Sequence, residues 1–287
     1  MNSQETRPEV TEQEIALVTN NTGSSVITIN ETGWDSRVYS VDGGEYFFKF
    51  PRSQKIQTRY PQEIAALNIA KQTHLVHVPE VLWEDSEHRF FGYRGVPGTL
   101  LDDLLPTLSN QQKKHVGNAI GRFLAVFHPQ TFPGVRTKTI EDEIAQLLEW
   151  YQPAVPILQD AYSGAEFAAI DTLVRHAWPA RMQELGYVAA LCHGDLHLSN
   201  MLIDTDASLG IIDFGDVAQY DESKDFIDLG DPIIEEAAIR AYGDSGLLRE
   251  KIAVRKRAVR IISLTYHIKK QNDTDVRKYL DLIRQDL

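Results

Sequence analysis

Residues 193–216 of the 287-residue chain read HGDLHLSNMLIDTDASLGIIDFGD, and this stretch is the most informative one about its fold. Two short apolar runs, 201–203 and 210–212, flank the polar, turn-forming residues 204–208. The pattern predicts a β-hairpin. Because a hairpin brings its two ends together, Asn200 and Asp213 are expected to lie side by side, with Asp195 on the loop that precedes Asn200.

These three polar residues are of the types that phosphoryl transfer requires. The reaction depends on Mg²⁺ held against the phosphates and on a carboxylate that accepts the proton of the attacking hydroxyl. Asp195 is the candidate base, and the oxygens of Asn200 and Asp213 suit Mg²⁺. The H-x-D-x-x-x-x-N and D-F-G patterns are each weak alone, but in this order across a predicted hairpin they indicate a kinase-type site.

An upstream lysine supplies a candidate phosphate-binding group. Lys49 interrupts the aromatic strand 45–50, which follows the run 37–41 across a turn at 42–44. Glu63 lies in the first turn of a helix that Pro61 opens, so an ion pair with Lys49 is reasonable. A surface lysine and a glutamate that only interacts with the helix dipole are the simpler alternatives.

The turn expected over the phosphates, residues 30–36, contains one glycine, whereas protein kinases have G-x-G-x-x-G there. Its backbone amides and the Ser36 hydroxyl could hold a phosphate. An ordinary hairpin loop explains the pattern nearly as well.

Together these motifs resemble those of aminoglycoside phosphotransferases, kinase-like enzymes that modify antibiotics. The resemblance rests on HGDLHLSN at 193–200 and IDFGD at 212–216 and covers about residues 26–236; GWDS at 33–36 with FKFPR at 48–52 looks most like the 2″-phosphotransferase branch. It implies an α+β, two-lobed protein-kinase-like fold. A small antiparallel-sheet lobe would hold residues 1–97, including the hinge, and a larger, mainly helical lobe would hold residues 98–287.

The resemblance also assigns roles. Asp195 would be the catalytic base, Asn200 and Asp213 the Mg²⁺ ligands, and Lys49, paired with Glu63, the phosphate-binding lysine. Segment 91–98 resembles the hinge that contacts the purine, so the remaining expected nucleotide contacts are Ser36, Tyr93, Gly95 and Val96. ATP or GTP would donate the γ-phosphoryl group to a cationic aminoglycoside, and the product would no longer bind the ribosome.

Acidic side chains crowd residues 216–236, where Lys224 is the only basic residue. A solvated charged face is the default interpretation. Carboxylates also bind the ammonium groups of polyamine sugars. By resemblance, the expected substrate-binding residues are Asp231, Glu235 and Glu236. Asp225 and Asp228 are expected to stabilise the loop or to cap helices.

The amino-acid composition excludes several kinds of partner and an internal disulfide. With 29 basic and 41 acidic residues, the net charge of −12 argues against nucleic acid or an anionic membrane as partner. No secretory signal or membrane-spanning run is visible, and the single cysteine, Cys192, excludes an internal disulfide. We therefore expect a cytoplasmic monomer.

Apolar residues at helical spacing predict helices in four further segments, 116–127, 139–151, 167–178 and about 250–269. Thr139 and Asp142 form a capping-box pattern at the start of the second of these.

Three alternatives stay open. The acceptor could be another small hydroxylated molecule: a macrolide, choline or an amino-sugar metabolite. His193 and His197 beside Asp195 could instead indicate a metal-dependent hydrolase, but the other histidines show no paired spacing. A silent nucleotide-binding scaffold would leave the complete Lys, Asp, Asn and Asp set unexplained. We expect His193 to hydrogen-bond the catalytic loop.

Overall fold

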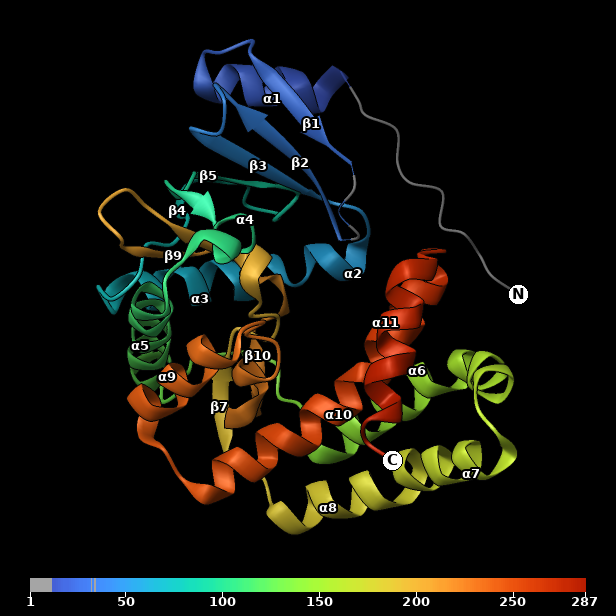
Figure 1. Cartoon of the computed structure of the whole chain (residues 1–287). Coiled ribbons are helices and arrows are strands. Elements are labelled where there is room, and N and C mark those ends of the chain that lie inside the picture. Colours follow the sequence, from blue (N-terminus) through green and yellow to red (C-terminus); the bar gives the residue numbers. More distant parts are fainter. Residues whose placement is uncertain (1–11, 32, 34) are drawn as a thin grey trace. The chain divides into compact units, whose positions relative to one another are not determined.

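The computed structural model describes residues 12–31, 33 and 35–287, whose helices and strands are labelled in Figure 1. The chain divides into two compact units that interleave along the sequence. The first unit contains the described residues up to Thr107 together with 132–134 and Leu198–Val217. The second contains Leu108–Thr131, Val135–His197 and Ala218–Leu287. The predicted hairpin therefore groups with the first unit although it comes late in the sequence.

An antiparallel sheet of five strands forms the centre of the first unit, as predicted. Its strands, in spatial order, are β1 (Ile27–Asn30), β2 (Ser36–Val41), β3 (Tyr46–Pro51), β5 (Phe91–Arg94) and β4 (Glu80–Glu84). The turn between β2 and β3 needs left-handed backbone at Asp42, Gly43 and Gly44, with φ of 50°, 71° and 103°. Asp and Gly tolerate that region best, so the predicted turn residues explain the tight connection.

Successive side chains of a strand point to opposite faces of the sheet. A helix covers each of these two faces. On one face Val18 of α1 (Glu12–Thr22) belongs to an apolar cluster whose buried strand residues include Tyr39, Val41, Phe48 and Phe50. The intervening Lys49 points to the other face, where it meets Glu63 of α3 (Tyr60–Gln72). Pro61 lies in the first turn of α3, as predicted.

The hairpin predicted from residues 201–212 is confirmed. Strands β8 (Met201–Ile203) and β9 (Leu209–Ile211) pair in antiparallel register, with Met201 opposite Ile211. Strand β6 (Thr99–Leu100) joins them on the other side of β8 and leads into the short helix α4 (Leu101–Leu104). A parallel bridge between His77 and Gly210 fixes the connection after α3 against β9.

The second unit is mainly helical. Its helices are α5 (Asn110–Phe127), α6 (Ile140–Ala161), α7 (Gly164–Thr172), α8 (Trp178–Leu185), α9 (Pro232–Gly243), α10 (Gly246–Lys269) and α11 (Asp273–Arg284). The capping box of Thr139 and Asp142 opens α6 as predicted. The predicted helix over 167–178 is interrupted, because a π-helical turn at Leu173–Ala177 joins α7 to α8. None of the described helices combines the length and apolar character that crossing a bilayer requires.

Two glycines allow α5 and α9 to approach closely. A Cβ atom at Gly117 would lie 2.2 Å from the Ile234 carbonyl oxygen, and one at Gly121 would lie 2.2 Å from the Ala238 carbonyl oxygen. Both distances are well below contact, so any side chain there would force the helices apart. The spacing of the apolar residues of α5 predicted which face of the helix is buried. It did not predict that two positions on this helix must be glycine.

Two short strands carry the loop 193–200, which contains the predicted base Asp195. Strand β7 (Ala189–Cys192) pairs antiparallel with β10 (Ala218–Asp221), and Cys192 lies opposite Ala218. The loop that begins at His193 therefore leaves the end of a paired, buried strand.

Candidate active site

Three charged residues form a cluster in the first unit. The Lys49 Nζ atom lies 2.7 Å from Glu63 Oε1 and 3.0 Å from Asp213 Oδ1. Lys49 is 8% exposed and Glu63 4%, whereas 55% of the Asp213 side chain is exposed. The predicted Lys49–Glu63 pair is thus present and buried, and Asp213 presents the accessible carboxylate of the cluster.

The charge of this lysine is secured by its neighbours. Burial alone would lower the pKa of Lys49, but the carboxylates of Asp213 and Glu63 outweigh it and hold the pKa well above its ordinary value. Lys49 therefore stays an ammonium at neutral pH, with its position fixed by Glu63. Such a group can attract phosphate oxygens without first being ordered.

The hairpin brings Asn200 and Asp213 together as predicted. The Ile212 amide donates to the Asn200 carbonyl oxygen at 3.0 Å, so the residue before Asp213 is hydrogen-bonded to Asn200. Asp213 itself adopts the left-handed region, with φ of 63°, immediately before the 3₁₀ turn Phe214–Asp216. Non-glycine residues rarely take this conformation, and such strain is concentrated at functional sites.

The side chains at these two positions fit the preference of Mg²⁺. A hard cation of this size takes oxygen ligands, usually one or two carboxylates together with phosphate oxygens and water. Asp213 supplies a charged oxygen and Asn200 a neutral one, and neither sulfur nor imidazole belongs to the pair. Asn200 and Asp213 would therefore be the residues that hold the ion.

The other predicted nucleotide contacts also lie in the first unit, and they differ in the partners that the structure gives them. The Ser36 hydroxyl is buried and 2.9 Å from the Tyr60 hydroxyl, so a phosphate would compete with that hydrogen bond. Tyr93 stacks on Phe47 with ring centroids 5.6 Å apart, and the Gly95 amide donates to the Glu45 carbonyl oxygen. Trp34, part of the motif that favoured the 2″ branch, lies outside the described residues.

The loop 193–200 that contains Asp195 belongs to the second unit up to His197. The Asp195 side chain is 52% exposed, and its Oδ2 atom lies 3.4 Å from His197 Nε2. The Asp195 amide donates to Nδ1 of the fully buried His193 at 3.3 Å. This contact confirms that His193 hydrogen-bonds the loop, and the Asp195 carboxylate is accessible.

A buried aspartate fixes the backbone of this loop. Asp225 accepts hydrogen bonds from the amides of His193 at 2.8 Å and Gly194 at 2.9 Å. His128 Nε2 lies 3.2 Å from the same carboxylate, and its Nδ1 atom is 3.0 Å from the Tyr242 hydroxyl. The expectation that Asp225 stabilises the loop is confirmed. His128 was not predicted, because it lies 97 residues from Asp225 in the sequence and no motif contains it.

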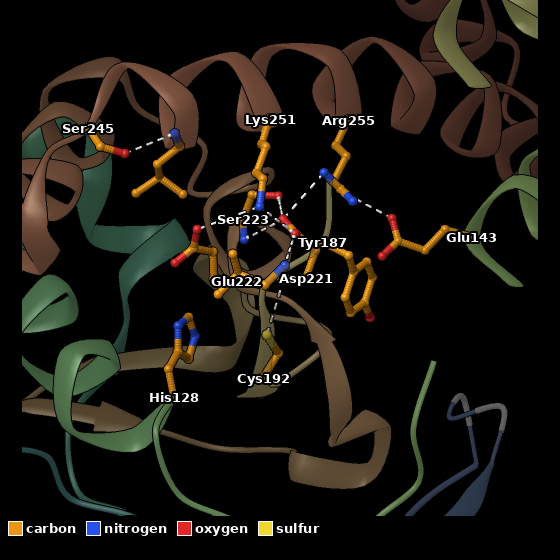
Figure 2. A network of polar contacts seen from close by, with 12 residues as sticks. His128, Glu143, Tyr187, Cys192, Asp221, Glu222, Ser223, Ser245, Lys251 and Arg255 are labelled. Atoms are coloured by element: carbon orange, nitrogen blue, oxygen red, sulfur yellow. Dashed lines mark hydrogen bonds and ion pairs between the residues drawn. The ribbon is translucent and has the colours of Figure 1, made fainter. Parts of the chain in front are cut away.

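A charged network supports the strand next to the loop (Figure 2). Asp221, at the end of β10, is fully buried and lies 2.9 Å from Lys251 Nζ and 3.3 Å from Arg255 Nη1. Arg255 also contacts Glu143 of α6 at 2.8 Å. The Cys192 thiol donates to the Asp221 carbonyl oxygen, so the network reaches the residue before the catalytic loop.

Within residues 12–31, 33 and 35–287 we find only one cluster of side chains that could bind a metal ion. This cluster does not suit the metal ion of a hydrolase. It consists of His128, Cys192 and Asp225, all buried, and includes neither His193 nor His197. Both ring nitrogens of His128 already have polar partners. Burial and the nearby Asp225 carboxylate raise the pKa of the Cys192 thiol, so it is a poor thiolate ligand.

The three predicted substrate carboxylates all lie at or on α9 in the second unit, and each has a basic partner. Asp231 caps α9 through the amides of Ile233 and Ile234 and pairs with Lys113 at 2.8 Å. Glu235 pairs with Lys256. Glu236 contacts Arg240 at 2.6 Å and Arg249 at 2.7 Å. A cationic ligand would have to compete with these internal cations.

The electrostatic surroundings of Asp195 keep its carboxylate ionised. Desolvation alone would raise its pKa, but the contact with His197 and the charges of His197 and His193 lower it below the ordinary value. Asp195 is therefore ionised at neutral pH and ready to accept a proton.

Replacement of His197 by Ala should move the acidic limb of the activity profile to higher pH. With Asp195 as the base, activity should fall as pH drops through the pKa of Asp195, and removal of His197 should let that pKa rise. At neutral pH kcat should change little. The measurement is kcat/KM as a function of pH, with the exposed His115→Ala as control; an acidic limb that does not move would show that His197 does not set the charge of Asp195.

Comparison with known proteins agrees with this geometry. Residues 26–254 match the family described as the phosphotransferase enzyme family. No curated protein sequence matches the chain closely enough to count as a relative.

Solved structures share the fold at low identity. The GDP and kanamycin complex of the aminoglycoside phosphotransferase APH(2″)-IIIa is 19% identical, with TM-score 0.72 over 96% of this chain and 98% of that one. The macrolide 2′-phosphotransferase MphH from Brachybacterium faecium is 17% identical, with TM-score 0.59 over 94% and 97%. The choline kinase LicA from Streptococcus pneumoniae is 17% identical, with TM-score 0.64 over 95% and 98%.

The family match spans most of the chain and includes Lys49, Asp195, Asn200 and Asp213. The chain belongs to the phosphotransferase enzyme family and has its kinase-like fold.

Proposed function

We propose that this phosphotransferase moves the γ-phosphoryl group of ATP or GTP to a hydroxyl of an aminoglycoside, with Mg²⁺, and so confers antibiotic resistance. The proposal rests on two charged groups that are already in position. Asp195 is ionised and accessible, on a backbone that Asp225 fixes. Lys49 is charged and is held by Glu63. Positioning and electrostatic stabilisation are what this reaction demands of a protein.

In this mechanism each residue has one task. Asp195 accepts the proton of the acceptor hydroxyl as the oxygen attacks the γ-phosphorus and the bond to the leaving nucleotide breaks. Lys49 would hold phosphate oxygens, and Asn200 and Asp213 would hold Mg²⁺. When bound, that ion would neutralise charge on the phosphates. We assign the nucleotide side to residues 1–97, including the hinge, and the acceptor side to residues 98–287, as a functional division.

The hinge residues Tyr93, Gly95 and Val96, together with Ser36, are proposed as further nucleotide contacts. The nucleotides named with the structural neighbours include GDP, ADP and ATP, which supports a nucleoside triphosphate as donor. A protein of net charge −12 attracts cations, which supports a cationic acceptor. A cytoplasmic monomer would have direct access to the nucleotide.

An acceptor screen tests the substrate class. The purified protein, Mg²⁺ and either ATP or GTP would be assayed for nucleotide consumption with gentamicin, kanamycin, a macrolide and choline. Aminoglycoside-dependent consumption is expected. Consumption that depends only on the macrolide or on choline would reject the aminoglycoside and retain the phosphotransferase, whereas hydrolysis that needs no nucleotide would reject both.

The proposed acceptor site makes a prediction about charge. Replacement of both Glu235 and Glu236 by Gln should raise the acceptor KM several-fold and weaken its salt dependence, while the nucleotide KM stays nearly constant. Lys256→Gln provides a matched test, because it frees Glu235 from its internal partner and should lower the acceptor KM. Unchanged acceptor kinetics in both variants, at low and at physiological salt, would remove Glu235 and Glu236 from the acceptor site.

A further inference from the structure

A cavity of about 480 Å³ lies in the first unit; its lining includes Gly95 and Val96 of the proposed hinge but none of Lys49, Glu63, Asn200 and Asp213. It is bounded by the end of α3, the connection from α3 to β4, the end of β5 and the residue before β9. Its polar lining residues are Lys71, His74, His77, Glu80, Arg94 and Ser208. The volume falls within the range of small-molecule sites, roughly 300–1,000 Å³.

The charge of this cavity is opposite to that of the chain as a whole. Glu80 is the only carboxylate in its lining, and its two oxygens are shared by Lys71 Nζ at 2.7 Å and Arg94 Nη1 at 3.1 Å. Two permanent cations thus face one anion, which leaves one positive charge uncompensated among these three residues. A concave basic surface on a protein with net charge −12 favours an anionic ligand.

The backbone holds the walls of the cavity in place. The His77 amide donates to the Leu209 carbonyl oxygen at 2.8 Å, and the His77 carbonyl oxygen accepts from the Ile211 amide at 2.8 Å. His74 is held in the left-handed region with φ of 55°. Because the walls are fixed by these contacts, a ligand would enter a largely formed site and lose little energy in ordering it.

We propose that this cavity binds the phosphate group of a small phosphate ester. Arg94 offers a planar fork of donors and Lys71 a point charge, the two side chains that most often bind phosphate. Val96 and Pro97 provide an apolar wall for the organic part of the ester. The cavity shares Gly95 and Val96 with the proposed hinge but is lined by none of the residues assigned to the reaction itself, so its failure would leave the proposed phosphotransfer untouched.

Calorimetric titration of the full-length protein tests the site, with phenyl phosphate and inorganic phosphate as probes at constant ionic strength. Lys71 and Arg94 side chains are each 54% exposed, so their replacement should leave folding intact. Phenyl phosphate should bind more tightly than inorganic phosphate. The double variant Lys71→Gln with Arg94→Gln should weaken its binding tenfold or more, because both phosphate-binding cations are lost.

The control removes the competing carboxylate. Glu80→Gln should tighten phenyl phosphate binding several-fold, because Lys71 and Arg94 no longer neutralise an internal anion. If Glu80 only stabilised the fold, Glu80→Gln would not tighten the binding of phenyl phosphate. Binding that is absent up to tens of millimolar ligand, or unaffected by either set of substitutions, would overturn the site, and equal affinity for inorganic phosphate would overturn its assignment to an ester.

Discussion

Asp195→Asn should lower kcat about a hundredfold or more while the affinity for Mg-nucleotide changes little. The amide keeps the size and shape of the side chain but cannot accept the proton of the acceptor hydroxyl. The contacts that hold the loop, from Asp225 to the amides of His193 and Gly194, do not involve the replaced side chain. Turnover and calorimetric nucleotide binding would be measured on the same preparation.

Asp228→Asn is the matched control, because it removes one carboxylate from the same unit. Burial and, to a smaller extent, the charge of Asp195 raise the pKa of Asp228. Asp228 has no assigned part in proton transfer, so its replacement should cost far less activity. Equal losses from the two substitutions, or preserved turnover in Asp195→Asn, would remove Asp195 from the role of base.

Lys251→Met should destabilise the fold by about 3–5 kcal/mol, the cost expected when one partner of a buried ion pair is removed. Lys251 and the Asp221 side chain are fully buried, and Glu222 lies 3.7 Å from the same Nζ atom (Figure 2). Methionine fills a similar volume but leaves Asp221 with one cation fewer. Denaturant unfolding followed by circular dichroism would measure the loss.

The pH dependence of this loss has a definite sign. Desolvation would raise the pKa of Asp221, but the charge of Arg255 and the hydrogen bond from Lys251 lower it in the folded protein. A lowered pKa contributes stability above the ordinary aspartate range, about 3.9, which disappears as pH falls through the folded value. The difference from the wild type should therefore be largest near neutral pH and shrink in acid.

Lys256→Met serves as the control on the same helix. Lys256 is partly exposed and pairs with Glu235, and exposed pairs contribute about 0–1 kcal/mol. A loss in Lys251→Met as small as that of the control would show that the buried network does not stabilise the fold.

The sequence predicted those parts of the site that depend on local pattern. Alternating apolar and turn residues predicted the 201–211 hairpin, and a hairpin necessarily brings Asn200 close to Asp213. Strand alternation placed Lys49 opposite the apolar face of its sheet, where Glu63 in the first turn of α3 could reach it. In each case short-range geometry limited the possible arrangements to very few.

Contacts between distant segments could not be predicted in this way. Nothing near His128 indicates that its ring meets Asp225, since only the packing of α5 brings them together. The basic partners of Glu235 and Asp231, Lys256 and Lys113, lie on other helices. The acidic stretch was visible in the sequence, but its neutralisation by these cations depends on tertiary structure.

Transfer of labelled phosphate from γ-labelled ATP or GTP to kanamycin, with the acceptor product identified by mass spectrometry, tests the proposed activity most directly. We predict one phosphoryl group on one acceptor hydroxyl, formed only with Mg²⁺ and absent with Asp195→Asn. Label that appears solely as inorganic phosphate with every aminoglycoside, or an acceptor modified without nucleotide, would contradict an aminoglycoside phosphotransferase.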